Sequence, residues 1–331
     1  MKGIAICEKF YNEVVKDMIM PIFPEHGAAL LGGGSEVLGF DDMMSRDHNW
    51  YPRCIIFMDG AEASLIEKAK KYFHDNLQSK FEGFETRLDI YCAKDYFEDH
   101  LGFDVYKIND IDWLTIPTQL LCELTKGAVF KESETLTQLR GKLKFYPHDI
   151  QLYILASQWE RIGQEMAFMG RCGDSGDNIG SALLCSRLFT YIMRLCFLYE
   201  KQYAPYWKWF GRAFSKLKCA KKMEPLIEAG LKADNWKDRE KYLSQAYIML
   251  GKIHNESGLT PAIPPEVVPY YTRPFMVAKV SEYQEALLSA INDKNIRALP
   301  KGIGAVDQIS DQTDFLGHKE IRLIQRNIYT S

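Results

Sequence analysis

The chain has 331 residues, which suits about two domains of ordinary size and allows a large buried core. Hydrophobic residues make up 47% and charged residues 26% of the sequence, a composition that excludes disordered and collagen-like proteins. With 41 Lys and Arg against 44 Asp and Glu, the net charge of −3 argues against binding of extended nucleic acid through bulk charge, although a local basic groove is compatible with it.

The first part of the chain is predicted to alternate between helices and strands. Apolar residues recur at helical spacing in two segments, and short apolar runs indicate three strands. Three glycines after the first strand predict a tight turn that opens a further helix at Ser35. The expected elements, in chain order, are a helix over 8–23 and strands over 28–31 and 50–58, then a helix over 61–78 and a strand over 86–92.

From about residue 146 onward, the pattern predicts a helical bundle. The expected helices cover residues 150–169, 179–199, 203–217, 236–254 and 276–291. Five prolines between Gly258 and Pro274 exclude a helix there and predict an ordered loop or crossover. The predicted fold is therefore a mixed α+β domain over residues 1–145, followed by an all-α domain over residues 146–331.

The eight cysteines are scattered, form no C-x-x-C pair and mostly have apolar neighbours, so we expect reduced residues of the core. The N-terminus becomes charged after a few apolar residues, and no uninterrupted apolar run reaches the roughly 18 residues of a membrane span. These features predict a cytoplasmic protein without a membrane partner.

The glycine-rich turn Gly32-Gly33-Gly34-Ser35 is the most informative segment. Glycines let backbone N–H groups approach a phosphate closely, and a serine hydroxyl adds a further hydrogen bond. No Gly-Lys-Ser/Thr sequence is present, which excludes a P-loop, and Val37 stands where a dinucleotide-binding motif needs its third glycine. The turn predicts phosphate binding but supports neither an ATPase nor a dehydrogenase.

Oxygen-bearing side chains follow at positions that suit a metal ion. Asp47 and Asn49 point the same way if their segment is extended. Asp89 lies in a predicted strand, on the face opposite Leu88 and Ile90, where a carboxylate needs a partner. Two or three such ligands facing a phosphate-binding turn are what a Mg²⁺ site for phosphoryl chemistry requires.

The combination of Gly34-Ser35, an interval of eleven residues, Asp47-x-Asn49 and a later strand carrying Asp89 resembles the nucleotidyltransferase superfamily, with its DNA polymerase beta-like fold. The surrounding sequence resembles an uncharacterised bacterial branch that pairs this domain with a helical one, and the resemblance extends over most of the chain. The similar segments are residues 33–41, 45–50, 158–165, 170–173 and 203–206.

This resemblance implies that Gly33, Gly34 and Ser35 hold the β- and γ-phosphates of a nucleoside triphosphate, with ATP as the default. An acceptor hydroxyl would attack the α-phosphorus and release pyrophosphate, so that a nucleoside monophosphate, AMP in the default case, is transferred. Arg46 and Arg53 flank the site, where they would contact the triphosphate or form ion pairs with nearby acids.

The same resemblance implies that Asp47, Asn49 and Asp89 hold Mg²⁺ or Mn²⁺ and that Asp89 helps to deprotonate the acceptor. The chain departs from the superfamily at Asn49, where a second carboxylate is expected, and an amide oxygen brings no negative charge. Asp41 and Asp42 would compensate if their loop folds back. The alternative is a degenerate, non-catalytic nucleotide-binding sensor.

Charged residues within the apolar helices suggest where an acceptor could bind. Arg161 and Glu165 share a helix face, as do Arg187 and Arg194, and Arg171 is a further charged residue in this strongly apolar part of the chain. These side chains either line an acceptor pocket or form salt bridges that lock the helices. A nearby group of aromatic residues either stacks on the acceptor or belongs to the core, namely Tyr203, Tyr206, Trp207, Trp209, Phe210 and Phe214.

The acceptor class stays open among a small molecule, a protein side chain and an RNA 3′ end, and the near-neutral charge favours the first two. Helical partners of small nucleotidyltransferases include ribonucleases with an Arg, four to six intervening residues and then a His. The nearest such pair here, Arg140 and His148, has seven residues between its members, which disfavours that activity.

Overall fold

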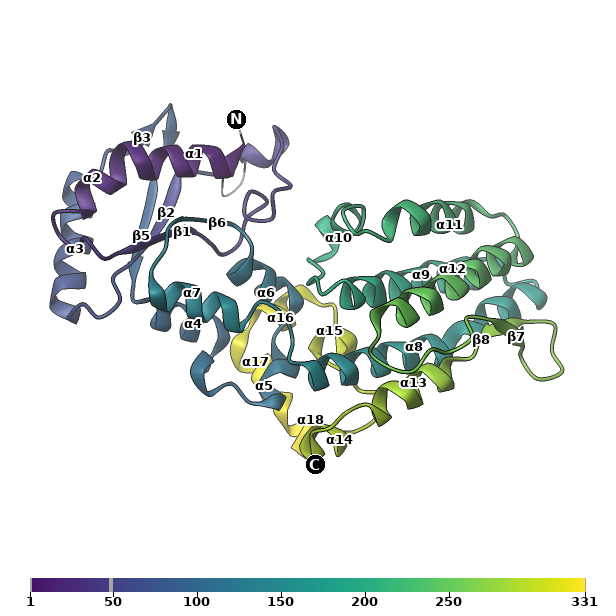
Figure 1. The fold of residues 1–331 in the computed structure, drawn as a ribbon. Helices are drawn as coiled ribbons and strands as arrows, with labels where there is room; N and C mark the ends of the chain where they lie inside the picture. Colours follow the sequence, from purple (N-terminus) through teal and green to yellow (C-terminus); the bar gives the residue numbers. More distant parts are fainter. Residues whose placement is uncertain (1, 48–49, 331) are drawn as a thin grey trace. The chain divides into compact units, whose positions relative to one another are not determined.

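The structure is a computed structural model that describes residues 2–47 and 50–330, with only the backbone described for residues 46 and 47. The chain divides into two compact units (Figure 1). The α/β unit contains Met1–Asn109 and Ile116–Lys144, and the helical unit contains Asp110–Thr115 and Phe145–Ser331. The short helix α5 (Asp110–Thr115), which the sequence pattern did not indicate, therefore belongs to the helical unit.

A four-stranded mixed sheet forms the centre of the α/β unit, in the order β5-β2-β1-β6. Strand β1 (Gly27–Leu30) is antiparallel to both β2 (Arg53–Phe57) and β6 (Ala128–Lys131), whereas β2 and β5 (Arg87–Tyr91) are parallel. The three strands expected from the sequence are present; β1 is shifted by one residue from the predicted range, and β2 and β5 are shorter than predicted. Strand β6 was not predicted because its four half-buried residues, which end at Lys131, do not form an apolar run like that of β1.

One face of this sheet packs against the N-terminal helix. Alternate residues of β2 and β5 point into that core, which also takes Ile6 and Phe10 from α1 (Gly3–Phe10). The helix continues through a π-helical turn, Tyr11–Val15, into α2 (Lys16–Ile19), so it begins and ends earlier than the predicted range 8–23. The opposite face of the sheet is left for polar groups at the start of β2 and β5.

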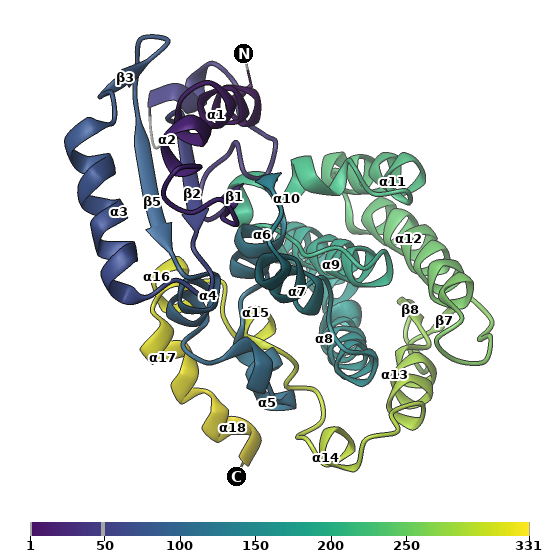
Figure 2. The same cartoon turned by 60° about the vertical axis from the view of Figure 1, so that its left-hand side comes forward.

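Helices and a small hairpin complete the α/β unit (Figure 2). The amphipathic helix expected after β2 is present as α3 (Ala63–Asn76). Ser133 caps the helix that follows β6 by accepting a hydrogen bond from the backbone of Leu136. The remaining elements are a 3-10 helix at Met44–Asp47, β3 (Lys80–Phe81), β4 (Phe84–Glu85), α4 (Ala93–Leu101), a 3-10 helix at Val105–Lys107, α6 (Thr118–Thr125) and α7 (Glu134–Lys142).

Long helices form the helical unit, as the periodicity predicted. Helices α8 (His148–Asp174) and α9 (Asn178–Tyr199) pack along each other, and α12 (Trp236–Ser257) packs against α9 and α11 (Ala220–Lys232). The expected helix over 203–217 is shorter and forms α10 (Trp207–Phe214). Helix α11, with Pro225 inside it, was not predicted.

The proline-rich stretch contains no helix, as predicted, but part of it forms a hairpin of β7 (Val267–Pro269) and β8 (Met276–Ala278). The helix expected from residue 276 therefore begins only at α13 (Val280–Ser289). Short helices follow to the end of the chain. They are α14 (Lys294–Arg297), α15 (Val306–Ile309), α16 (Thr313–Gly317), α17 (Lys319–Ile324) and α18 (Arg326–Thr330).

Within the described part of the chain, α9 alone has the length and hydropathy of a membrane-spanning helix. More than half of its most apolar stretch is buried inside the helical unit, and it carries Arg187 and Arg194. A core helix meets the same criteria of length and composition.

Candidate functional site

The glycine turn lies directly after β1, beside the start of β2. Because β1 and β2 are antiparallel, with Ala29 opposite Ile55, the end of β1 meets the first residue of β2. The turn does not open a helix, contrary to the sequence-based prediction. Residues 35–39 form successive turns instead, which end at Gly39, where φ is +71° and the N–H donates to the Glu36 carbonyl oxygen at 3.0 Å.

Several hydrogen-bond donors of this turn are unused. The backbone N–H of Gly32 donates to the carbonyl oxygen of Glu123 at 2.9 Å. Within the described residues, the N–H groups of Gly33, Gly34 and Ser35 donate to no acceptor, and the Ser35 hydroxyl has no partner either. Consecutive free N–H groups in a glycine turn form a concavity suited to an anion.

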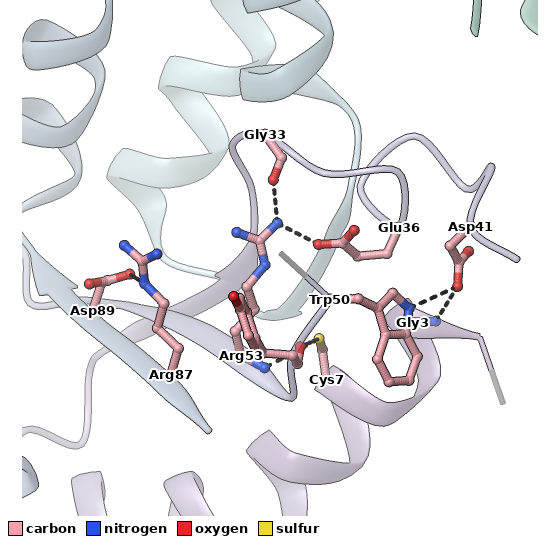
Figure 3. Close-up of polar contacts among 10 residues, drawn as sticks. Gly3, Cys7, Gly33, Glu36, Asp41, Trp50, Arg53, Arg87 and Asp89 are labelled. Atoms are coloured by element: carbon pink, nitrogen blue, oxygen red, sulfur yellow. Dashed lines mark hydrogen bonds and ion pairs between the residues drawn. The ribbon is translucent and has the colours of Figure 1, made fainter. Parts of the chain in front are cut away.

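Arg53, the first residue of β2, ties the turn to the sheet (Figure 3). Its Nη2 donates to the Gly33 carbonyl oxygen at 2.5 Å and to Glu36 Oε1 at 2.6 Å. The sequence left two roles open for Arg53, contact with a triphosphate or an ion pair with a nearby acid. The structure contains the ion pair, with Glu36. Its Nε is buried and has no acceptor among the described residues.

Glu36 is an unexpected part of the site, since its side chain is only 1% exposed. Burial raises the pKa of its carboxyl group, and the neighbouring Arg53 opposes that shift. A Cβ at Gly34 would lie 2.4 Å from Glu36 Oε1, so the turn needs glycine there both for its positive φ and for this contact. A buried carboxylate thus lies against the inside of the turn.

Asp89 lies on the same face of the sheet as Arg53. The register pairs Arg53 with Arg87 and Ile55 with Asp89, and alternate residues of a strand share a face. Its neighbours along β5, Leu88 and Ile90, pack on the core side, as the sequence predicted. Asp89 Oδ2 accepts from Arg87 Nε at 3.1 Å, and the Asp89 side chain is 34% exposed (Figure 3). The carboxylate is therefore paired but still accessible.

Two further groups of this face were missed by the sequence reasoning. The Tyr96 ring packs edge-on against the Phe57 ring at a centroid distance of 5.6 Å, and burial raises the pKa of its hydroxyl. Glu123 faces the turn, because a Cβ at Gly33 would lie 3.8 Å from its Oε1. Burial also raises the pKa of Glu123. The only sign of Glu123 in the sequence was its position between two apolar residues, Cys122 and Leu124 of α6.

The remaining predicted metal ligands and one arginine lie largely outside the described residues. Asn49 lies outside the described residues. Of Arg46 and Asp47 only the backbone is described, and these two residues are the last of the 3-10 helix before β2. Within the part that is described, no three or more His, Cys, Asp or Glu side chains form a group suited to a metal ion. Asp89 offers accessible carboxylate oxygens of the kind that Mg²⁺ prefers.

Asp41 and Asp42 have other partners than a metal site. Asp41 Oδ2 accepts from the backbone of Gly3 at 2.7 Å and from Trp50 Nε1 at 3.2 Å (Figure 3). It thereby caps the first turn of α1. Asp42 Oδ1 accepts from the backbone N–H of Ser45 at 3.1 Å. The expected compensation for Asn49 by Asp41 is wrong, because this buried carboxylate holds the N-terminal helix in place.

Three of the four charged residues proposed for acceptor binding meet in the helical unit. Arg161 Nη2 and Arg187 Nε both donate to the Tyr191 hydroxyl oxygen, at 3.1 Å and 2.5 Å. Arg187 also pairs with Glu165 at 2.8 Å, while Arg171 instead lies 3.8 Å from Asp174. Tyr191 was missed by the sequence reasoning. These contacts match the helix-locking alternative, and Arg171 does not join the group.

The aromatic group near α10 is divided between core and surface. Trp207 and Tyr206 are exposed at 51% and 41% of their surface. The other members are buried, namely Tyr203, Trp209, Phe210 and Phe214. Stacking on a ligand is therefore restricted to Tyr206 and Trp207.

Comparisons with known proteins give two similarities. A family model described as a domain of unknown function, DUF4037, matches residues 113–210. The crystal structure of a nucleotidyltransferase-like protein from Exiguobacterium sibiricum 255-15 is similar with a TM-score of 0.35 and 11% identity, over 76% of this chain and 77% of that one. No curated protein matches the chain. A likeness of this size assigns neither residues nor an activity, so function has to be argued from the site itself.

Proposed function

We propose that the chain is a metal-dependent nucleotidyltransferase, which moves a nucleoside monophosphate from a nucleoside triphosphate to an acceptor hydroxyl and releases pyrophosphate. One observation carries the proposal. The unused N–H groups of Gly33, Gly34 and Ser35 lie at the end of β1, next to the strands that carry Arg53 and Asp89 on one face of the sheet. ATP as the donor rests on the resemblance of the sequence motif alone.

The turn supplies the groups that a triphosphate needs. Free backbone N–H groups bind phosphate oxygens without the desolvation cost of a side-chain charge, and the Ser35 hydroxyl adds one more donor. Arg53 is already held beside the turn by the Gly33 carbonyl oxygen. Because a guanidinium has five donors, Arg53 keeps hydrogen bonds available for a phosphate while it stays bound to Gly33.

In the proposed reaction Asp89 acts at the α-phosphate, which is supported by its accessible carboxylate on the same sheet face as Arg53. With Asp47 and Asn49 it would hold Mg²⁺ or Mn²⁺, an ion that, when bound, neutralises charge on the phosphates. The acceptor oxygen forms a bond to the α-phosphorus, and the bond to the β-phosphate oxygen breaks, leaving its electron pair on pyrophosphate. The acceptor proton passes to a carboxylate oxygen of Asp89.

A second candidate function is a nucleotide-binding sensor without catalysis. It is favoured by the amide at Asn49, where a carboxylate is expected, and by the ion pair that Asp89 makes with Arg87. Both features lower the negative charge available to a metal ion. The two functions share the glycine turn and differ in whether the bound nucleotide is turned over.

Transfer of a label from the α-phosphate of each nucleoside triphosphate into RNA, protein or small-molecule fractions of a cell extract tests the proposal. Asp89→Ala and Asp47→Ala are expected to reduce metal-dependent transfer by roughly 10²–10³-fold or more. The matched control is Asp75→Ala, an exposed carboxylate of α3 in the same unit, which should transfer normally. Full activity of Asp89→Ala would overturn the site, and nucleotide binding without any transfer would favour the sensor.

Asn49→Asp separates a weakened enzyme from a sensor. The change restores a third negative charge, so transfer and Mg²⁺ affinity should both rise if Asn49 is a ligand. Titration of activity with Mg²⁺ measures both effects. An unchanged titration would remove Asn49 from the metal site.

A further inference from the structure

Positive charge is concentrated in one segment of the helical unit, residues 201–223, which we name the basic edge. The segment contains seven Lys and Arg residues and no Asp or Glu, a net charge of +7. The rest of the chain therefore carries −10, because the whole chain carries −3. The seven residues are Lys201, Lys208, Arg212, Lys216, Lys218, Lys221 and Lys222.

The basic edge runs from the end of α9 through α10 into the first turn of α11, and all seven basic side chains are exposed. Figure 1 shows α10 and α11 along one edge of the helical unit. Five of the lysines form no ion pair within the described residues. These are Lys201, Lys208, Lys218, Lys221 and Lys222.

Three of the acids near this segment have partners other than its lysine side chains, whereas Glu224, which follows the segment directly, lies three residues after Lys221 on α11. Glu200 precedes it directly, but its carboxylate accepts from the backbone N–H groups of Lys218 and Cys219, both at 2.8 Å. Asp311 accepts from Trp207 Nε1 at 3.2 Å. Glu228, further along α11, pairs with Lys232 at 3.0 Å. The five lysines without an ion pair among the described residues thus keep a positive field that a polyanion would neutralise.

Two exposed aromatic rings lie within the basic edge, Tyr206 and Trp207. The Arg194 guanidinium of α9 lies 5.8 Å from the centre of the Trp207 ring. Exposed rings among cations are typical of proteins that bind single-stranded nucleic acids, because bases stack on the rings while the cations follow the backbone. The apolar face of α10 is buried in the core through Trp209 and Phe210, so it is not available for insertion into a lipid surface.

We propose that the basic edge binds the phosphate backbone of a single-stranded nucleic acid, with bases stacked on Trp207 and Tyr206. The negative charge elsewhere does not prevent this, because charges are screened beyond about 10 Å at 0.1 M salt. An RNA 3′ end then becomes the acceptor of the transfer reaction. That last step rests on the proposed function, whereas the binding itself does not.

Fluorescence anisotropy of the full chain with a labelled single-stranded RNA of about 20 nucleotides, and with DNA of the same sequence, tests the binding. Lys208→Glu, Lys221→Glu and Lys222→Glu combined should weaken binding at least about tenfold and make the salt dependence shallower by about two units of slope. Trp207→Ala should weaken binding about tenfold with the salt slope unchanged. Binding of both RNA and DNA, or of RNA alone, supports the proposal.

The matched control reverses three exposed lysines elsewhere in the helical unit, Lys241, Lys252 and Lys294. Equal losses in both triple variants would overturn the proposal, as would an absence of oligonucleotide binding. Sedimentation with vesicles that contain phosphatidylserine provides the remaining arm, and binding to vesicles but not to oligonucleotides would also overturn it. Thermal melting of each variant shows that a loss of binding is not a loss of folding.

Transfer of label into the bound RNA separates this inference from the proposed function. RNA binding that depends on the basic edge, without any transfer by the wild-type chain, would support the proposed binding and refute the proposed transferase activity. Transfer into RNA that the lysine variant and the wild-type chain perform equally would overturn the inference and leave the enzyme.

Discussion

One set of buried side chains in the helical unit forms a continuous series of hydrogen bonds, which we name the His254 network, whereas the glycine turn of the α/β unit has backbone donors without an acceptor among the described residues. Trp159 Nε1 donates to the Tyr199 hydroxyl oxygen at 2.7 Å, and that hydroxyl donates to His254 Nδ1 at 2.8 Å. His254 Nε2 then donates to the Thr260 hydroxyl oxygen at 2.8 Å. In the α/β unit, the N–H groups of residues 33–35 have no acceptor within the described part of the chain.

The contrast separates polar groups that stabilise the fold from donors that are free to bind water or a ligand. A buried polar group costs free energy unless it has a hydrogen-bond partner. In the His254 network, each side chain from Trp159 to Thr260 has such a partner. The turn gains no stability from backbone donors that meet no acceptor among the described residues. The two units therefore respond differently to substitution, and each of the following changes tests one side of the comparison.

Acidification should destabilise the helical unit by protonating His254 and breaking the His254 network. Burial lowers the pKa of His254 to about 4, against 6.5 for an unburied histidine. As pH falls below 6.5 the unfolded chain takes up a proton before the folded one, so stability is full above pH 6.5 and is lost toward pH 4. Urea unfolding should show a loss of about 2–3 kcal/mol between pH 7 and pH 4.5.

The control for that loss is His254→Gln, which has no titrating group at this position. Its stability should be lower at pH 7 and should fall less on acidification than that of the wild-type chain. Equal losses in both proteins would show that other groups govern the acid sensitivity.

Gly34→Ala tests the shape of the turn. Alanine would need a φ of +144° and would place its Cβ 2.4 Å from Glu36 Oε1, so we expect a loss of about 1–3 kcal/mol in unfolding free energy. Gly33→Ala is the matched control, because the nearest side-chain atom to its Cβ would be 3.8 Å away. Thermal denaturation of both variants provides the measurement. A larger loss for Gly33→Ala would contradict the described turn.

Glu36→Gln tests whether the buried carboxylate competes with an incoming triphosphate. Removing one negative charge from the inside of the turn should tighten ATP binding about tenfold, which corresponds to about 1.4 kcal/mol. Gln can still accept the hydrogen bond from Arg53, so the turn keeps its support. Calorimetry with ATP and Mg²⁺ measures the affinity. Glu165→Gln, its counterpart in the helical unit, should leave ATP affinity unchanged, and weaker binding by Glu36→Gln would refute the competition.

Arg161→Ala should have the smallest effect. The Arg161 guanidinium lies 4.8 Å from the Tyr191 ring centre and donates to its hydroxyl, so its removal should cost less than about 1 kcal/mol. Chemical denaturation checks this value. A loss of transfer greater than about tenfold at unchanged stability would return Arg161 to the acceptor site.

The sequence predicted the features that depend on local periodicity. Strand alternation placed Asp89 opposite Leu88 and Ile90, and helical spacing located α8, α9 and α12. The helix expected at Ser35 is absent because the chain reverses at Gly39, where φ is +71° and the next residue, Phe40, donates its N–H to the Ser35 carbonyl oxygen at 2.9 Å. Such a backbone angle is not readable from the sequence.

The missed site residues have partners that are distant in the sequence. Glu36 became part of the site only through Arg53, which reaches it from β2, and Glu123 through its approach to Gly33 from α6. Such pairings depend on the tertiary fold. The basic edge is different, because its seven charges are readable from the sequence but were hidden by the net charge of the whole chain.

The most direct test of the glycine turn follows its backbone amides by NMR while ATP and Mg²⁺ are added to the nitrogen-15-labelled chain. If these donors hold the triphosphate, the amides of Gly33, Gly34 and Ser35 will show the largest chemical-shift changes, and these changes will saturate. The amides of the His254 network will shift less. ATP binding that saturates without shifting these three amides would contradict the account.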